Sequence, residues 1–264
     1  MIIFEQLMVA RYQAEITKIK TTAFSDQDVI NLILQRSEII KDQTRAGKAV
    51  KDWTQGDATQ LRSIAEKLGD ELIYRAAGII WLEYMEIFES IQTLSTLKVA
   101  DIGCGYALFD YFLYEDFKSD IFLIDIEETK ERHFGFSKSG AAYSSLPVAR
   151  QFLQDNGVPT EKIFCLNPEQ DNVMDLPEMD LVVSFISCGF HYPVATYDNF
   201  FKNRIRPGGG IILDVRAQRF ENQKPILENY GTTKILTKAA NGKAMRLFTV
   251  RGKDHSSSSR KTSA

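Results

Sequence analysis

The chain has 264 residues, with 32 Lys and Arg against 35 Asp and Glu, and 44% of its residues are hydrophobic. This ordinary globular composition with a near-neutral charge argues against nonspecific nucleic-acid binding, so nucleic acid is not an expected partner. No run approaches the roughly 18 apolar residues of a membrane span, and acidic and polar residues come too early in the N-terminal MIIFEQLMVARYQ for a signal peptide. We therefore expect a cytoplasmic protein without a membrane partner. Three cysteines without CxxC spacing disfavour disulfides and structural zinc.

Residues 1–95 are expected to form an α-helical N-terminal region, because apolar residues recur there at intervals of three and four positions. Ser25, with an acid three residues later, is typical of a helix start. A second apolar stripe covers residues 57–91, and glycines at 69 and 78 are expected to interrupt it. The pattern leaves open whether these helices serve as a lid, as a substrate-binding element or as the surface of a homodimer.

Residues 96–251 show a different pattern, in which short apolar runs alternate with segments of helix length. The runs are LKVADIG, DIFLIDI, KIFCLN, MDLVVSFI and GGIILDV. Such runs predict buried strands of a doubly wound, mostly parallel sheet with helices on both faces. Ser145 and Pro147 predict the start of one of these helices.

The C-terminal part is expected to end in an antiparallel hairpin. Asn241-Gly242 stands between two further strand-like runs, and this dipeptide favours a two-residue type I′ turn. The predicted fold is therefore α/β, with seven strands in all. Residues 252–264 are polar and of low complexity, which predicts a disordered tail.

The strongest motif is a glycine-rich turn, Asp101-Ile102-Gly103-Cys104-Gly105, which follows the first of these strands. Glycine adopts positive φ easily and lets a ligand approach the backbone closely. Asp125 ends the second strand, and an acid at that place can accept both hydroxyls of a ribose. A nicotinamide-dependent oxidoreductase would use the same two features, although Leu108 stands where its GxGxxG motif needs a small residue.

Two later segments complete the pattern. Residues 171–177, DNVMDLP, precede the fourth strand, and residues 205–210, IRPGGG, begin the approach to the fifth. Together with the glycine-rich turn and Asp125, and in this order, they resemble the class I S-adenosylmethionine-dependent methyltransferases over about residues 97–251. The resemblance implies S-adenosyl-L-methionine as the cofactor.

The resemblance also implies which residues bind this cofactor. They are Asp101, Gly103, Cys104 and Gly105 around the methionine part, Asp125 and Ile126 at the ribose, Asn172 and Val173 at the adenine, and Ser184 at the end of the fourth strand. The chain departs from the family pattern in two places. Ala107 replaces the third glycine. Asn172 replaces an acid that accepts a hydrogen bond from the adenine amino group, and the amide oxygen of asparagine can still accept that bond.

The acceptor is expected to meet the segment after the fourth strand and the loop after the second. His191 is the first candidate for a general base, since an ordinary histidine pKa of about 6.5 permits proton acceptance at neutral pH. The alternative for His191 is simple packing with its aromatic neighbours. His133 is the second candidate base, and the candidate substrate-binding residues are Phe134, Tyr143 and Tyr192.

The predicted function is methyl transfer to a small-molecule acceptor. A hydroxyl acceptor, such as that of a sugar or a similar polyol, is the favoured interpretation. No metal site is expected, because Ser, Cys and His rather than an acid follow the fourth strand. The alternatives are a non-catalytic binding protein with the same fold, or the oxidoreductase.

Overall fold

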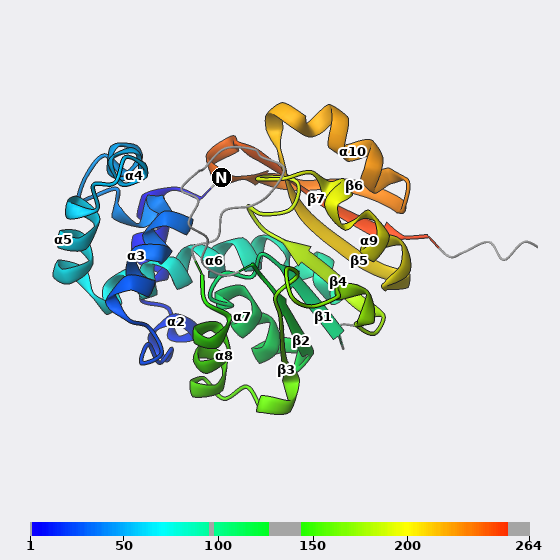
Figure 1. The fold of residues 1–264 in the computed structure, drawn as a ribbon, viewed down its shortest axis with the longest axis horizontal. Coiled ribbons are helices and arrows are strands. Elements are labelled where there is room, and N and C mark those ends of the chain that lie inside the picture. The colour runs from blue at the N-terminus through cyan, green and yellow to red at the C-terminus, as the bar shows by residue number, and fades with distance from the viewer. Residues whose placement is uncertain (1, 95–97, 127–143, 253–264) are drawn as a thin grey trace, which may run out of the picture.

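The computed structural model describes residues 2–94, 98–126 and 144–252, which form a seven-stranded sheet beside a group of N-terminal helices (Figure 1). The strand order is β3-β2-β1-β4-β5-β7-β6. Neighbours from β3 to β5 pair in parallel, whereas β7 is antiparallel to both β5 and β6. The strands are β1 (Lys98–Ile102), β2 (Asp120–Ile124), β3 (Ile163–Leu166), β4 (Met179–Ser184), β5 (Ile205–Arg216), β6 (Gly231–Ala239) and β7 (Ala244–Arg251). This arrangement confirms the predicted α/β fold and its antiparallel hairpin.

Helices pack on both faces of the sheet, because alternate residues of its strands bury apolar side chains on opposite sides. One face packs against α6 (Asp70–Gln92), α7 (Leu108–Phe117) and α8 (Leu146–Asp155). The other face packs against α9 (Asp198–Asn203) and α10 (Phe220–Glu228). The N-terminal helices add to the apolar core on the first of these faces.

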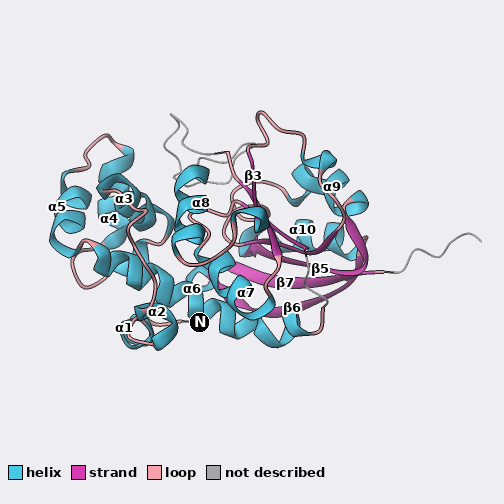
Figure 2. Cartoon of the chain, turned by 90° about the horizontal axis from the view of Figure 1, so that it is seen from below, coloured by secondary structure: helices cyan, strands magenta, loops and turns pink. Residues whose placement is uncertain are grey.

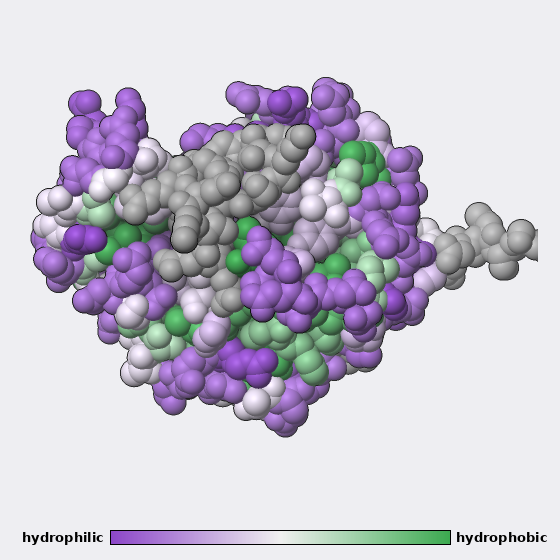
Figure 3. Space-filling model, in the orientation of Figure 1, coloured by the Kyte–Doolittle hydropathy of each residue, from purple (hydrophilic) through white to green (hydrophobic). Residues whose placement is uncertain are grey.

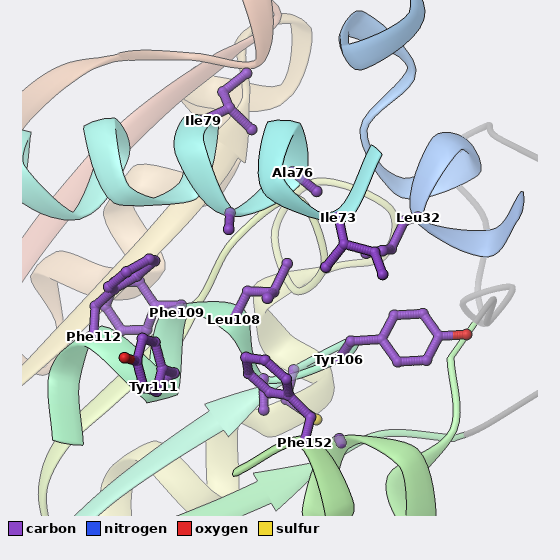
Figure 4. Packing of buried hydrophobic residues seen from close by; sticks show 14 of the residues in the cluster. Leu32, Ile73, Ala76, Ile79, Tyr106, Leu108, Phe109, Tyr111, Phe112 and Phe152 are labelled. Carbon is purple, nitrogen blue, oxygen red and sulfur yellow. The ribbon is translucent and has the colours of Figure 1, made fainter. Parts of the chain in front are cut away.

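The N-terminal region is helical, as expected, and lies to one side of the sheet (Figures 1 and 2). Its helices before α6 are α1 (Phe4–Ala10), α2 (Ala14–Thr17), α3 (Asp26–Gln35), α4 (Ala46–Thr54) and α5 (Thr59–Leu68). Their buried residues belong to the same apolar core as α6, α7 and one face of the sheet. In this core Leu32 of α3 lies beside Ile73 of α6, with Leu108 of α7 below them (Figure 4).

Local sequence signals explain how two of these helices begin. The Ser25 hydroxyl accepts a hydrogen bond from the Asp28 N–H, while the Asp28 carboxylate accepts one from the Ser25 N–H, so α3 starts with a capping box. The Ser145 hydroxyl likewise accepts a bond from the Val148 N–H at the start of α8. Both predicted helix starts are confirmed.

The prediction that Gly78 interrupts a helix is wrong. α6 passes through Gly78 without a break, whereas Gly69 does separate α5 from α6. A β-carbon on Gly78 would lie 3.2 Å from the Arg11 backbone nitrogen and 3.3 Å from a methyl carbon of Leu7. Gly78 therefore allows the end of α1 to approach α6 closely.

The predicted two-residue hairpin turn is also wrong, although the hairpin itself is present. Ala239 of β6 pairs with Ala244 of β7, so four residues connect the strands. Ala240, Asn241 and Gly242 all have positive φ, and the Lys243 N–H donates to the Ala240 carbonyl. The Asn-Gly pair adopts the left-handed backbone that it favours, but within a longer turn.

Polar residues dominate the face of the molecule shown in Figure 3, and apolar residues occur there in small groups. Across residues 2–94, 98–126 and 144–252, no helix has both the length and the apolar character that crossing a membrane requires. The predicted tail and most of the 126–144 loop lie outside the described residues.

Candidate cofactor and acceptor site

The glycine-rich turn is tied to the end of β2. The Gly103 N–H donates to the Ile124 carbonyl at 2.7 Å, and the Gly105 N–H donates to Asp125 Oδ2 at 2.9 Å. The other carboxylate oxygen of Asp125 accepts a bond from the Ile126 N–H at 2.8 Å. Each carboxylate oxygen can accept two hydrogen bonds. Asp125 therefore braces the turn and has the acceptor chemistry that ribose hydroxyls require.

Gly103 brings the loop after β4 onto the turn. Its φ is +76°, and a β-carbon there would lie 2.1 Å from the Ser187 hydroxyl oxygen, so no other residue fits without moving Ser187. The Ser187 hydroxyl is also 3.0 Å from the Tyr192 hydroxyl. The carboxyl ends of β1, β2 and β4 thus converge here, which is where ligands bind in open α/β sheets.

The loop after β4 is strained and firmly held. Ile186 has a φ of +51°, a left-handed conformation that a β-branched residue rarely adopts. The buried Ser184 hydroxyl donates to the Ile102 carbonyl at 2.6 Å and accepts from the Cys188 N–H at 2.9 Å. Arg216 Nε donates to the Phe190 carbonyl at 2.7 Å. Ser184 therefore positions the loop relative to β1, and its predicted contact with the cofactor stays a prediction.

The two candidate acceptor residues of this loop have different surroundings. His191 is partly exposed, its N–H donates to the Ser187 carbonyl at 2.8 Å, and its ring packs edge-on against Phe190. Burial, with smaller contributions from groups including Asp125, raises the pKa of Tyr192 well above its ordinary value, so this phenol keeps its proton. His133, Phe134 and Tyr143 lie outside the described residues.

Asp101 forms a buried carboxyl pair with Asp110 of α7. Burial and the neighbouring Asp110 raise the pKa of Asp101, and burial raises the pKa of Asp110. Within the described ranges, Asp101 Oδ1 and both Asp110 carboxylate oxygens lack a hydrogen-bond donor. Two carboxylates buried beside each other favour the state in which they share a proton, which is the direction of both pKa shifts.

Asp110→Asn is expected to flatten the dependence of stability on pH. Because the pKa of Asp110 is raised on folding, the folded chain holds a proton that the unfolded chain releases above about pH 4. The contribution of this proton to the free energy of unfolding is thus complete below about pH 4, and it is lost as the pH rises towards neutrality. Urea unfolding at pH 5 and pH 8 measures this decline, with Glu66→Gln, at an exposed position on α5, as the control. An equal decline in the Asp110 variant would contradict the assignment.

The segment expected at the adenine is a short turn. Asn172 caps it, since its side-chain oxygen accepts from the Met174 N–H at 3.1 Å and its amide nitrogen donates to Asp175 at 3.0 Å. The adenine roles of Asn172 and Val173 stay predictions.

Burial raises the pKa of Cys104, in the glycine-rich turn, well above its ordinary value, so this thiol is not reactive.

Two residues beside the glycine-rich turn, Asp110 and Gln35, are not among those that the sequence predicts. Asp110 is a buried acid in the otherwise apolar start of α7. An acid among apolar residues can be recognised in the sequence, and it indicates a buried charged or hydrogen-bonded group. Gln35, at the end of α3, lies against Gly105. Local spacing contains no signal for Gln35, because the contact joins residues that are far apart in the chain.

In the part of the chain that the structure describes, no three His, Cys, Asp or Glu side chains are grouped so that they could hold a metal ion. Asp214 near the end of β5 is paired with Arg246.

The position of β7 distinguishes this sheet from that of the nicotinamide dinucleotide fold, in which six parallel strands have the order 3-2-1-4-5-6. Here an antiparallel β7 lies between β5 and β6. A solved structure from Nostoc punctiforme PCC 73102, named as an O-methyltransferase, is similar at 15% identity with a TM-score of 0.50, over 85% of this chain and 72% of that chain. The chain has the class I methyltransferase fold.

Two further solved structures of methyltransferases match this class I methyltransferase fold more loosely. Magnesium protoporphyrin IX methyltransferase from Synechocystis PCC 6803, solved with bound S-adenosylmethionine, is 14% identical over 88% of this chain and 100% of that chain, with a TM-score of 0.46. A protein from Methanococcus maripaludis named as an S-adenosylmethionine-dependent methyltransferase is 14% identical over 79% and 94%, with a TM-score of 0.47. No protein-family model and no curated protein matches the sequence.

Proposed function

We propose that this protein is an S-adenosylmethionine-dependent methyltransferase that acts on a small-molecule acceptor. One observation carries the proposal. In a class I methyltransferase fold, the Asp125 carboxylate at the end of β2 faces the glycine-rich turn at the end of β1 and binds its Gly105 N–H. Strand ends that converge in this way place a ribose acceptor beside a glycine-rich turn, at the edge of the sheet where ligands bind in open α/β folds.

The residues present fit such a cofactor. Asp125 would hold the ribose, the turn from Gly103 to Gly105 would adjoin the methionine part, and the segment around Asn172 would meet the adenine. When bound, the cofactor supplies an electrophilic methyl group. The chain would act mainly by aligning the acceptor with it, and alignment of reactants can contribute about 7–11 kcal/mol.

We further propose a hydroxyl acceptor, with a sugar or similar polyol as one class. Tyr192 keeps its proton and lies 3.0 Å from the Ser187 hydroxyl, so the loop after β4 has polar groups that suit a hydroxylated ligand. His191 is the group of this loop that can remove a proton. A cytoplasmic location and a homodimer through the N-terminal helices stay predictions.

Calorimetry with S-adenosylhomocysteine, NADH and NADPH tests the cofactor. We expect binding of S-adenosylhomocysteine alone, and binding of a nicotinamide cofactor alone would overturn the proposal. Transfer of a labelled methyl group to a panel of polyols, phenols, amines and carboxylic acids then tests the activity. Cofactor binding without transfer to any acceptor would favour a non-catalytic binding protein.

His191→Ala is expected to lower kcat by at least about tenfold with a smaller change in KM, because a positioned general base typically contributes about 10²–10⁴ in rate. The measurement is kcat against pH once an acceptor is known. The acidic limb of the wild-type profile should disappear in the variant. A wild-type profile in His191→Ala would show that His191 has only a packing role.

A further inference from the structure

One face of α3 is bonded to the glycine-rich turn. Asp28, Asn31 and Gln35 lie on that face, because they are spaced by three and four residues. The Asn31 amide donates to the Tyr106 hydroxyl at 3.0 Å, and this hydroxyl donates to Asp28 Oδ1 at 2.7 Å. Asp28, Asn31 and Tyr106 are all buried. Tyr106 directly follows Gly105, so α3 is fixed to the turn itself.

The last residue of α3 reaches the turn at Gly105. A β-carbon on Gly105 would lie 2.9 Å from Gln35 Oε1 and 3.4 Å from Gln35 Nε2. Both polar atoms of this amide therefore lie where a side chain of residue 105 would begin. The absence of a side chain at Gly105 is what lets the amide approach so closely.

The next residue fixes the end of α3 from the other side. Arg36 forms a two-bond ion pair with Glu83 of α6, at 2.9 Å and 2.7 Å, and both side chains are buried. A paired arginine–carboxylate fork is strong and directional. Gln35 is thus held between two anchored positions, Asn31 one turn earlier and Arg36 directly after it.

We propose that Gln35 recognises the amino-acid end of the cofactor, so that the helical N-terminal region completes the cofactor site. This inference rests on the proposed function. A ligand whose ribose is held by Asp125 and which extends along the turn past Gly105 meets the Gln35 amide. A carboxamide both donates and accepts hydrogen bonds, so it can bond to the carboxylate and to the ammonium group of an amino acid.

The test compares two ligands that differ only at this end. S-adenosylhomocysteine carries the amino acid, whereas 5′-deoxy-5′-methylthioadenosine has the same adenine, ribose and sulfur without it. Gln35→Ala is expected to weaken S-adenosylhomocysteine binding by about tenfold, as for the loss of a hydrogen bond to a charged group, and to change methylthioadenosine binding less than twofold. Gln55→Ala, at an exposed glutamine that follows α4, is the control and should alter neither affinity.

Gln35→Met keeps the length of the side chain and serves if the alanine variant does not fold. It removes the N–H donor and the amide oxygen together, so it should also weaken binding of S-adenosylhomocysteine selectively. Equal weakening of both ligands would mean that Gln35 only supports the turn, and unchanged affinity for both would place it outside the site; either result overturns the inference. If the wild-type chain binds neither ligand, the proposed function itself fails.

Discussion

Asp125→Ala is expected to weaken the binding of S-adenosylhomocysteine by about 100-fold and to leave the fold intact. The substitution removes a carboxylate that accepts bonds from the N–H groups of Gly105 and Ile126 and that we propose to hold the ribose. Hydrogen bonds to a charged group contribute about 1.5–3 kcal/mol each, and two such bonds at the lower end of that range correspond to about 100-fold in affinity. Calorimetric titration measures the effect.

Asp120→Ala is the matched control, because Asp120 begins the same strand at its opposite end and pairs with the surface residue Lys162. This control should bind the ligand as the wild type does. Circular dichroism should show the same secondary structure in both variants. If the Asp125 variant bound the ligand as tightly as the wild type, Asp125 would not hold the ribose, and the proposed function would lose its main support.

Arg246→Met is expected to lower the free energy of unfolding by about 3–5 kcal/mol, the range observed when one partner of a buried ion pair is removed. Arg246 in β7 is fully buried and bonds to both carboxylate oxygens of Asp214, at 2.7 Å and 2.9 Å. It also lies 3.4 Å from Glu83 of α6. Burial alone would raise the pKa of Glu83, but Arg36 and Arg246 together lower it to about 2. The variant would leave the Asp214 charge buried without its cation.

Urea unfolding followed by circular dichroism measures this loss. Lys238→Met, at an exposed position on the neighbouring β6, is the control and should change stability by less than about 0.5 kcal/mol. The double variant Arg246→Met with Asp214→Leu should recover part of the loss, because it removes the unpaired charge as well. A loss below about 1 kcal/mol in the single variant would contradict the importance of the pair.

These charges also connect the N-terminal helices to the sheet. Glu83 bonds to Arg36 at the end of α3, while Arg246 bonds to Asp214 within the sheet. Replacing Arg246 by a neutral residue therefore removes a contact with the sheet, at Asp214, and a contact with α6, at Glu83. The same link holds Gln35 near the turn, so the N-terminal region and the candidate cofactor site are parts of one packed structure.

Local sequence determined much of this protein. The strands, the helix starts at Ser25 and Ser145, the glycine-rich turn and the position of Asp125 follow from patterns that span a few residues, because periodicity, capping and positive φ are local properties. The strand order was accessible only through the resemblance to a family, since short-range patterns do not specify which strands pair. The candidate cofactor residues likewise came from that resemblance.

Only the tertiary structure decided which distant residues meet at the turn. Gly103 adjoins Ser187, Gly105 adjoins Gln35, and the raised pKa of Asp101 depends in part on Asp110 in the next helix. The close approach of α1 to α6 at Gly78 likewise joins residues that are far apart in the chain. Such contacts arise from the packing of whole elements, in which burial and close approach outweigh local preference. They join residues that no short stretch of sequence contains, and they are the basis on which we propose that α3 contributes to the cofactor site.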